Sequence, residues 1–442
     1  MDIYSIGDRI YKIIEKYNVD DIAIRVSKSI SKMIRFTNNE IVVSKEWVEV
    51  GASIYIGYKH RILMAGINEF SEKNIENVVG NLLKSAKYIK PLEDYVSLPK
   101  GRFKYSVIEK CFDERILEED LTEKVYDAIN AALNSGAKRV AGVLNAGIGE
   151  KLLLTSGDVK ASDKGTRISI TVRGFSDSMS SGQGISCSRT LDGFNPILAG
   201  ERAGRVAKMA KKAVEGKPGR YMVILDPTVV GNLFNYIAYN LSAFSIIGKV
   251  SFFTDKLDKE VASDILNLID DGRMPGGLGS TMFDDEGVPT QRNVLIERGV
   301  LKGYLHNTRT AKKFGVNSTG NAGWIFPRPW NIIIDGGEHG EEELFNEIKE
   351  GVYITNNWYT RYQNIREGIF SSITRDAVFY IKNGEIINAV RGLRISDSFL
   401  NLLKNIQGMT RKKWPVIWWE VSIPTYAPYI LLKELNLTRA TK

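Results

Sequence analysis

The chain has 442 residues, of which 43% are hydrophobic and 25% charged, so its composition excludes wholesale disorder and its length predicts two domains. No apolar run reaches the roughly 18 residues of a transmembrane helix, Met1–Ser5 does not begin a signal peptide, and only two cysteines are present. We therefore expect a cytoplasmic protein without a disulfide scaffold and without a membrane partner. The net charge of +8 comes from basic residues interleaved with acids, which argues against specific nucleic-acid binding.

The first half of the sequence contains an internal duplication. Phe36–Ser44 is echoed by Leu154–Ser162, and each copy places a turn pair (Asn38-Asn39 or Ser156-Gly157) beside a strand-like run. A further alternating strand is expected after each copy, at Ser53–Tyr58 and Ile168–Phe175. Helical periodicity flanks both groups, over Ile3–Tyr17, Ile75–Ile89, Leu121–Ser135 and Ile197–Gly216. The pattern predicts an α+β domain over residues 1–219, built from two duplicated helix–antiparallel sheet–helix units.

The second half, residues 220–442, has short strand patterns and frequent glycines, which predict a β-rich, sandwich or barrel-like domain. Gly216 and Pro218 are expected to separate it from the first domain. The expected strands are Asn293–Glu297, Leu301–His306, Ile332–Asp335, Gly351–Thr355, Val378–Ile381 and Trp414–Val421. The expected helices are Val230–Ala243, Ala262–Ile269, Glu342–Ile348 and Asp397–Asn405.

The segment Asp284–Ala322 concentrates polar and turn-forming residues within this β-rich pattern and includes His306, one of only three histidines. It resembles the signature of the TldD/PmbA family of metal-dependent peptidases and their non-catalytic relatives, historically labelled modulators of DNA gyrase. Further similarity lies in Thr360–Asp376, Ile381–Ile386 and Arg391–Ser396. The duplicated first half and β-rich second half are also what this family implies.

In the catalytic branch, the resemblance implies a His-Glu-x-x-x-His helix and a later cysteine, which together hold one metal ion beside a general base. Here Asn235 and Asn240 occupy the histidine positions and Tyr236 the glutamate position. No cysteine follows Cys187, so the corresponding loop, Gln407–Pro415, lacks the third ligand. An amide is a poor zinc ligand and tyrosine cannot be the base at neutral pH. The chain therefore resembles the PmbA/TldE-like branch, in which we expect no metal and no catalytic residues.

Several other polar segments suit either a functional or a structural role. His306, Asn307, Thr308 and Arg309 could line a peptide channel or could fix a strand-to-loop turn. Asp284–Glu286 could form a paired-carboxylate site, but a turn or an ion pair with Arg292 is favoured. The loop Gly276–Thr281 lacks the following lysine and helix of a phosphate site. Ser180–Ser188 is expected to be a flexible hairpin tip, with Cys187 lacking a base.

The remaining histidines and the aromatic C-terminal region suggest surface or structural roles. His60 is expected to be exposed, and His339 to lie in a loop before a helix with acidic residues in its first turn. Trp418 and its aromatic neighbours suit either a subunit contact or a core.

The resemblance implies a non-catalytic subunit that pairs with a TldD-like metallopeptidase, whose zinc and general base would act on unfolded or extended peptides. Two alternatives remain open. The chain could be a homodimer that binds peptides without cleaving them, or a metal-free hydrolase with an unrelated nucleophile.

Overall fold

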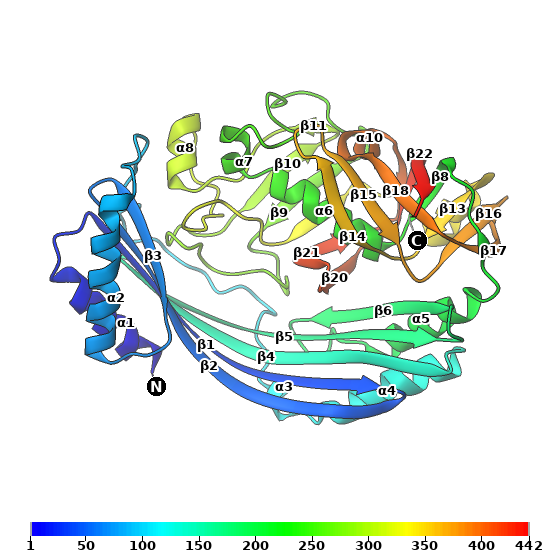
Figure 1. The fold of residues 1–442 in the computed structure, drawn as a ribbon, viewed down its shortest axis with the longest axis horizontal. Helices are drawn as coiled ribbons and strands as arrows, with labels where there is room; N and C mark the ends of the chain where they lie inside the picture. The colour runs from blue at the N-terminus through cyan, green and yellow to red at the C-terminus, as the bar shows by residue number, and fades with distance from the viewer. Residues whose placement is uncertain (1, 441–442) are drawn as a thin grey trace.

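The computed structural model describes residues 2–440. Its N-terminal part is one antiparallel sheet in the order β3-β2-β1-β4-β5-β6. The strands are β1 (Asp21–Thr37), β2 (Glu40–Tyr58), β3 (Arg61–Ile67), β4 (Arg139–Thr155), β5 (Lys160–Phe175) and β6 (Ser181–Ser188). The helices are α1 (Ile3–Glu15), α2 (Glu72–Ser85), α3 (Arg115–Glu118), α4 (Leu121–Asn134) and α5 (Pro196–Met209), with a 3-10 turn at Ala86–Tyr88. Figure 1 shows this sheet curving beneath the rest of the chain.

The predicted duplication is confirmed, and its two halves meet in a single sheet. Each half is a helix, three antiparallel strands and a second helix, and β1 pairs with β4 at the seam. Asn38 and Asn39 form the β1–β2 turn with φ of 51° and 71°, values that asparagine tolerates better than most residues. Polar side chains start the helices: Asp2 accepts hydrogen bonds from two α1 amides, and Asp120 accepts one from α4.

Two expectations for this half are wrong. Ser180–Ser188 is not a flexible tip, because residues 181–188 form the edge strand β6 paired with β5. Helix α5 ends at Met209, well before Gly216, and Val214–Glu215 instead forms the short strand β7 beside a strand of the C-terminal part. The expected strand Ser53–Tyr58 is the C-terminal end of the longer β2.

The C-terminal part contains two further sheets. One has the order β11-β10-β9-β12-β21-β20, and the other β14-β15-β18-β22-β8-β13-β16-β17-β7, with β19 paired to β22. The first is built from β9 (Asn267–Asp271), β10 (Arg292–Glu297), β11 (Val300–Leu301), β12 (Ile332–Asp335), β20 (Trp414–Trp418) and β21 (Val421–Ala427). The second adds β8 (Gly219–Leu225), β13 (Glu350–Ile354), β14 (Asn357–Asn364), β15 (Ile369–Thr374), β16 (Val378–Lys382), β17 (Glu385–Arg391), β18 (Leu393–Ser398), β19 (Ile406–Met409) and β22 (Ile430–Arg439).

Helix α6 (Pro227–Asn240) lies between these sheets and shares one apolar core with both (Figure 1). The other helices of this part are α7 (Ala243–Ile247), α8 (Thr308–Phe314), α9 (Glu341–Asn346) and α10 (Phe399–Lys404). The predicted α+β class is confirmed. Throughout residues 2–440 the sheets are open rather than closed into a barrel.

Three predicted elements of the C-terminal part differ in the structure. Ala262–Ile269 is not a helix, since its last residues enter strand β9 and pair with β10 and β12. Leu301–His306 is a strand only at its first residue, because the chain then turns toward α8. Trp414–Val421 is not one strand, because the chain reverses after Trp418 to form the β20–β21 hairpin.

Candidate functional site

Helix α6 carries the three positions at which the catalytic branch would have its motif. Its first turn is fixed by Asp226, which accepts a hydrogen bond from the Thr228 amide, and by Pro227 at the first helical position. Asn235 and Asn240 are each only 4% exposed, and Tyr236 packs against the same core. The helix therefore holds these side chains within the protein rather than on its surface.

Asn235 is committed to the fold by hydrogen bonds in both directions. Its side-chain amide donates to the carbonyls of Gly231 and Ile423, each at 3.0 Å, and to the Thr425 hydroxyl at 2.9 Å. Its side-chain oxygen accepts from the Ile423 amide at 2.8 Å. The Asn235 side-chain oxygen, which would have to face a metal, thus accepts from β21, while the side-chain amide donates to the same strand.

Tyr236 and Asn240 form a second linked group. The Tyr236 hydroxyl donates to the Thr360 carbonyl at 2.7 Å, and the Asn240 amide donates to the Tyr362 hydroxyl at 2.6 Å. Burial raises the pKa of Tyr236 above its ordinary value, so the phenol stays protonated. A neutral phenol that already donates its proton to a carbonyl cannot accept one from a water molecule.

These residues do not fit a zinc ion. Of the two side-chain oxygens at the histidine positions, that of Asn235 is engaged by a backbone amide, and only that of Asn240 lacks a partner. Within residues 2–440, no three His, Cys, Asp or Glu side chains gather as a metal-binding group. One amide oxygen does not make a zinc site, which needs three or four N, S or carboxylate ligands.

Cys187 does not replace the missing ligand or serve as a nucleophile. Its thiol is buried and donates to the Pro415 carbonyl at 3.3 Å. Burial raises the pKa of this thiol to about 12, so the reactive thiolate is not formed at neutral pH. Its role is to join the edge strand β6 to β20.

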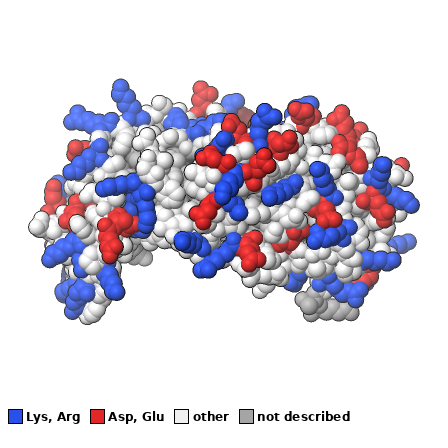
Figure 2. All heavy atoms as spheres, turned by 90° about the horizontal axis from the view of Figure 1, so that it is seen from above, with Lys and Arg blue, Asp and Glu red and all other residues white. Residues whose placement is uncertain are grey.

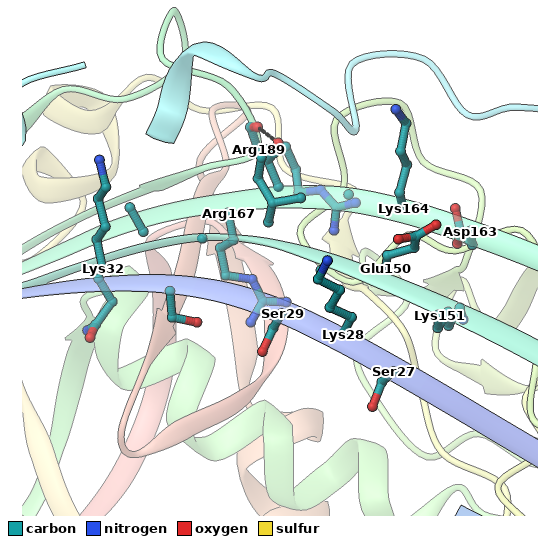
Figure 3. A pocket seen from close by; sticks show the side chains of 18 of the residues that line it. Ser27, Lys28, Ser29, Lys32, Glu150, Lys151, Asp163, Lys164, Arg167 and Arg189 are labelled. Carbon is teal, nitrogen blue, oxygen red and sulfur yellow. Dashed lines mark hydrogen bonds between the residues drawn. The ribbon is translucent and has the colours of Figure 1, made fainter. Parts of the chain in front are cut away.

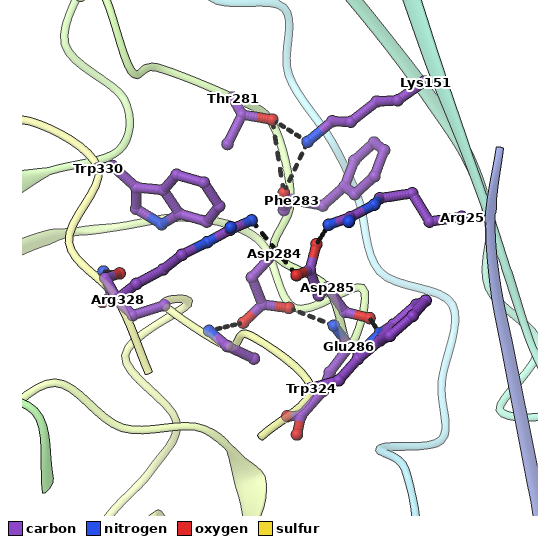
Figure 4. A network of polar contacts seen from close by, with 12 residues as sticks. Arg25, Lys151, Thr281, Phe283, Asp284, Asp285, Glu286, Trp324, Arg328 and Trp330 are labelled. Carbon is purple, nitrogen blue, oxygen red and sulfur yellow. Dashed lines mark hydrogen bonds and ion pairs between the residues drawn. The ribbon is translucent and has the colours of Figure 1, made fainter. Parts of the chain in front are cut away.

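The segment Asp284–Glu286 forms a buried turn that joins the two parts of the chain (Figure 4). Asp284 accepts from the amides of Glu286, Val288 and Ala322, each at 2.9 Å. Asp285 pairs with Arg25 of β1 at 2.6 Å and with Arg328 at 3.3 Å. The turn interpretation is therefore confirmed.

The expected ion pair with Arg292 is wrong, because Arg292 lies at the edge of its sheet beside Asp271. Glu286 instead accepts from the amide and hydroxyl of Thr308. Burial raises the pKa of Glu286 to about 7 and that of Asp284 well above its usual range. Because Asp284 and Glu286 are buried and already accept hydrogen bonds from the protein, a substrate cannot reach them and they are not placed to act as a base.

The four candidate channel residues lie at the start of α8. Asn307 caps this helix, Thr308 bonds Glu286, and Arg309 lies 3.6 Å from Asp94. His306 is 4% exposed, its Nδ1 atom has no hydrogen-bond partner, and its ring packs on Phe314. Burial lowers the pKa of His306 to about 4. None of the four lines either of the two large cavities between the N-terminal sheet and the C-terminal part, so their channel role stays a prediction.

The other residues weighed as sites have structural surroundings. His60 is exposed on the β2–β3 turn and stacks on Tyr95. His339 bonds Glu347 at 2.7 Å, in the loop before α9, whose first turn holds three glutamates. The loop Gly276–Thr281 is followed by an isolated bridge at Phe283 and the Asp284–Glu286 turn rather than by a helix. These placements agree with the structural interpretations.

Two adjoining cavities of about 600 Å³ each lie between the N-terminal sheet and the C-terminal part. Asn145 and Ser169 line both cavities. The first cavity, which we call the serine–glycine cavity, is bounded by β1, β4 and β5, by Arg189, and by Ser280 and Thr281 (Figure 3). Its volume suits a short length of extended peptide.

The second cavity, which we call the tryptophan cavity, is bounded by the β20–β21 hairpin. Trp418, Trp419 and Arg375 line it from the C-terminal part, opposite β1, β2, β4 and β5. Arg375 lies over the rings of Trp358 and Trp419, 4.7 and 5.9 Å from their centroids. The aromatic sequence near Trp418 pointed to this region, but nothing local in the sequence placed it against the N-terminal sheet.

On the face in Figure 2, basic and acidic side chains are mixed rather than gathered into a stripe of one charge. In the described part of the chain, no helix has the length and apolar character needed to cross a bilayer.

Comparison with known proteins places this architecture in a family. Residues 22–86, 114–211 and 218–439 match domain 1, the central domain and the C-terminal domain of the PmbA/TldA metallopeptidases. A metalloprotease from Methanocaldococcus jannaschii is 26% identical over 91% of this chain and 92% of its own. A metalloprotease PmbA homologue from Haemophilus influenzae is 27% identical over 81% of this chain and 79% of its own.

Solved structures show the same fold. TldE from Thermococcus kodakarensis superposes with a TM-score of 0.85 at 22% identity, over 98% of this chain and 100% of its own. A Thermotoga maritima protein named for a proposed modulation of DNA gyrase superposes with a TM-score of 0.87 at 23% identity, over 99% of this chain and 100% of its own. The matched domains account for most of the sequence, and the chain belongs to the TldD/PmbA family of metalloprotease homologues.

Proposed function

We propose that this chain is a non-catalytic, PmbA/TldE-like subunit of a heteromeric metallopeptidase that processes unfolded or extended peptides. A TldD-like partner would supply the zinc ion and the general base, and the assembly would be cytoplasmic. The observation that carries the proposal is the use of Asn235. Its side chain bridges α6 and β21 through three hydrogen bonds, where the catalytic branch would have a metal ligand.

The cavities support a role in holding peptide. They lie between the curved sheet and the C-terminal part. The first is lined by serines, glycines and charged side chains, and the second by arginines and aromatic side chains. Such a surface can bind an extended chain and position it for a neighbouring subunit, while Asp163 at its edge is already engaged by Thr281 and Met282.

The test is a peptidase assay of this chain, of a TldD-like partner with an intact His-Glu-x-x-x-His motif, and of both together. We expect cleavage of an unfolded peptide to increase when both are mixed, and no cleavage by this chain alone. The matched control is a partner in which the motif glutamate is replaced by glutamine. Metal analysis of the purified chain should find no bound zinc, and stoichiometric zinc would contradict the proposal.

The second candidate is a homodimer that binds peptides without cleaving them. It is favoured by the fact that this chain forms both cavities without a partner. A stable homodimer that binds peptide and does not associate with any TldD-like subunit would establish this function instead.

A further inference from the structure

The floor of the serine–glycine cavity is made of small residues. Ser29, Gly149 and Gly165 are paired across β1, β4 and β5, and Ser31, Gly147 and Arg167 form the next row on the same face. Side chains alternate between faces along a strand, and Arg25 on this face of β1 reaches Asp285, so the face is directed toward the C-terminal part. Small residues thus leave room above the sheet, with Arg167 at one side.

Two guanidinium groups meet at the wall of this cavity. Arg167 and Arg189 both donate to the Leu278 carbonyl, at 2.7 and 3.1 Å, and Arg189 also donates to the Cys111 carbonyl at 3.1 Å. A Cβ atom placed on Gly165 would come within 2.1 Å of Arg189, so the Arg189 guanidinium covers this glycine. One carbonyl oxygen cannot neutralise two cations.

The neighbouring acids do not balance these cations. Asp163 accepts from the Thr281 hydroxyl at 2.6 Å and from the Met282 amide at 3.1 Å. Glu150 is paired in register with Lys28 and Lys164, on the opposite face of β4 from Lys151. In residues 2–440, neither Arg167 nor Arg189 forms an ion pair with a carboxylate. Burial and the neighbouring Arg189 lower the pKa of Arg167.

The cavity basic residues are not all directed at the same space. Lys32 donates to the Leu117 carbonyl and Lys164 lies over Phe112, both on the helix side of the sheet. In Figure 3 these lysines extend away from Ser27 and Ser29. Lys151 is held by Thr281 and the Phe283 carbonyl (Figure 4). Lys28 is paired in register with Glu150, on the face of β1 opposite to Ser29. Arg167 and Arg189 are therefore the cations at the cavity wall that keep unused donors on the floor side of the sheet.

We propose that Arg167 and Arg189 bind a carboxylate of an extended peptide whose backbone lies on the serine–glycine floor. The inference rests on the proposed function, and it adds a substrate preference. Arg167 uses one of its five donors within the protein and Arg189 uses two, so an incoming carboxylate finds free N–H groups on both. A planar guanidinium matches a carboxylate in a two-point hydrogen bond, and bringing an anion here relieves the repulsion between the two cations.

The carboxylate can come from a peptide C-terminus or from an acidic side chain, and three fluorescent probes separate these sources. Each is an unstructured peptide of about ten glycine, serine and threonine residues. The first has a free C-terminus, the second an amidated C-terminus and one central glutamate, and the third an amidated C-terminus and a central glutamine. Fluorescence anisotropy with the full chain measures their affinities. We expect the first or the second probe to bind at least about tenfold more tightly than the third.

Two variants assign the preference to the guanidinium pair. Arg167→Gln is expected to reduce carboxylate-probe affinity roughly tenfold and leave the neutral-probe affinity unchanged, while Arg167→Lys should retain part of the preference. Arg189→Gln should also reduce the affinity for the carboxylate probe. The matched control is Arg366→Gln, at an exposed loop arginine outside both cavities. Thermal melting of each variant checks that it is folded.

The inference is overturned if the three probes bind equally, if none binds, or if the preference survives Arg167→Gln and Arg189→Gln in folded protein. These outcomes are separate from failure of the proposed function, which is measured by activation of a TldD-like partner. A chain that activates the partner without any carboxylate preference would keep the function and refute this site.

Discussion

Arg25 Nη1 lies 2.6 Å from Asp285 Oδ1, and this ion pair joins the N-terminal sheet to the family signature segment. Asp285 is 9% exposed, and its second oxygen is 3.3 Å from Arg328. The Arg25 guanidinium also lies 5.4 Å from the centre of the Trp324 ring, whose indole N–H donates to the Asp285 carbonyl. The signature segment therefore acts as the attachment point between the two parts of the molecule, between which the cavities lie.

Replacing Arg25 with alanine is expected to weaken this attachment. The change leaves the mostly buried Asp285 carboxylate with only its more distant partner, Arg328. We therefore expect a loss of about 1–3 kcal/mol in unfolding free energy. Urea denaturation followed by tryptophan fluorescence measures it. Arg220→Ala is the matched control, because its pair with Glu434 is exposed on both sides and should contribute less than about 1 kcal/mol. Equal losses for the two variants would refute the attachment role.

Asn235→Ala is expected to destabilise the protein by about 2–4 kcal/mol, because it removes the hydrogen bonds between α6 and β21 and leaves the buried Ile423 amide without its side-chain acceptor. Asn134→Ala, at an exposed position of α4, is the control and should change stability by less than about 0.5 kcal/mol. Thermal and urea unfolding measure both. A loss at Asn235 no larger than at Asn134 would show that the side chain is not structural.

Restoring the motif at α6 alone should not create a zinc site. In the triple variant Asn235→His, Tyr236→Glu, Asn240→His, two imidazoles are present but the later cysteine is still missing, since the last cysteine is Cys187. We expect no stoichiometric zinc by elemental analysis after dialysis, and no peptidase activity without a partner. Stoichiometric zinc in the folded variant would show that the surroundings of α6 still form a metal site.

Local sequence patterns predicted the elements whose signal lies in their own residues. Asn38-Asn39 marked a hairpin turn, and the periodic apolar residues of α1, α2 and α4 marked helices that the structure contains. Ala262–Ile269 has a similar apolar spacing, but its last residues pair with β10 and β12, and pairing with distant strands overrides local preference. The absence of the metal motif could be recognised from the sequence, because the motif depends only on which residues occupy positions 235, 236 and 240.

The cavities could not be predicted in the same way. Arg25 and Asp285 are 260 residues apart in the chain, and Arg167 and Leu278 are 111 apart. In the sequence, Gly147 and Gly149 only weaken the prediction of a strand. Their role as a bare floor depends on the curvature of the sheet and on which face the C-terminal part covers, and neither is encoded in a local pattern.

His306 predicts a specific dependence of stability on pH. Burial lowers its pKa to about 4, below the value near 6.5 expected in the unfolded chain. The depressed folded-state pKa means that this contribution to stability is complete above pH 6.5 and is lost as the pH falls toward 4. The loss is at most about 3 kcal/mol.

The variant His306→Gln should therefore lose less stability than the parent protein between pH 7 and pH 4.5. Urea unfolding at several pH values measures the difference. His60→Gln is the control, because His60 is exposed on the β2–β3 turn. If both variants follow the parent curve, burial of His306 does not govern the acid sensitivity.

Two glycines on the same face of β4 allow a direct test of the serine–glycine cavity. A Cβ atom on Gly149 meets nothing within 4 Å, whereas one on Gly147 would lie 2.7 Å from the Ile30 carbonyl oxygen. Gly149→Val should therefore project into open cavity, keep or slightly raise the melting temperature because valine favours strands, and reduce peptide affinity. Gly147→Val should instead destabilise the sheet by about 1–3 kcal/mol, through crowding against backbone. Anisotropy with an unstructured peptide, and partner activation in the peptidase assay, measure the effect on binding. Unchanged peptide affinity in a fully folded Gly149→Val protein would place the peptide outside this cavity, because the substitution takes up space there without disturbing the surrounding strands.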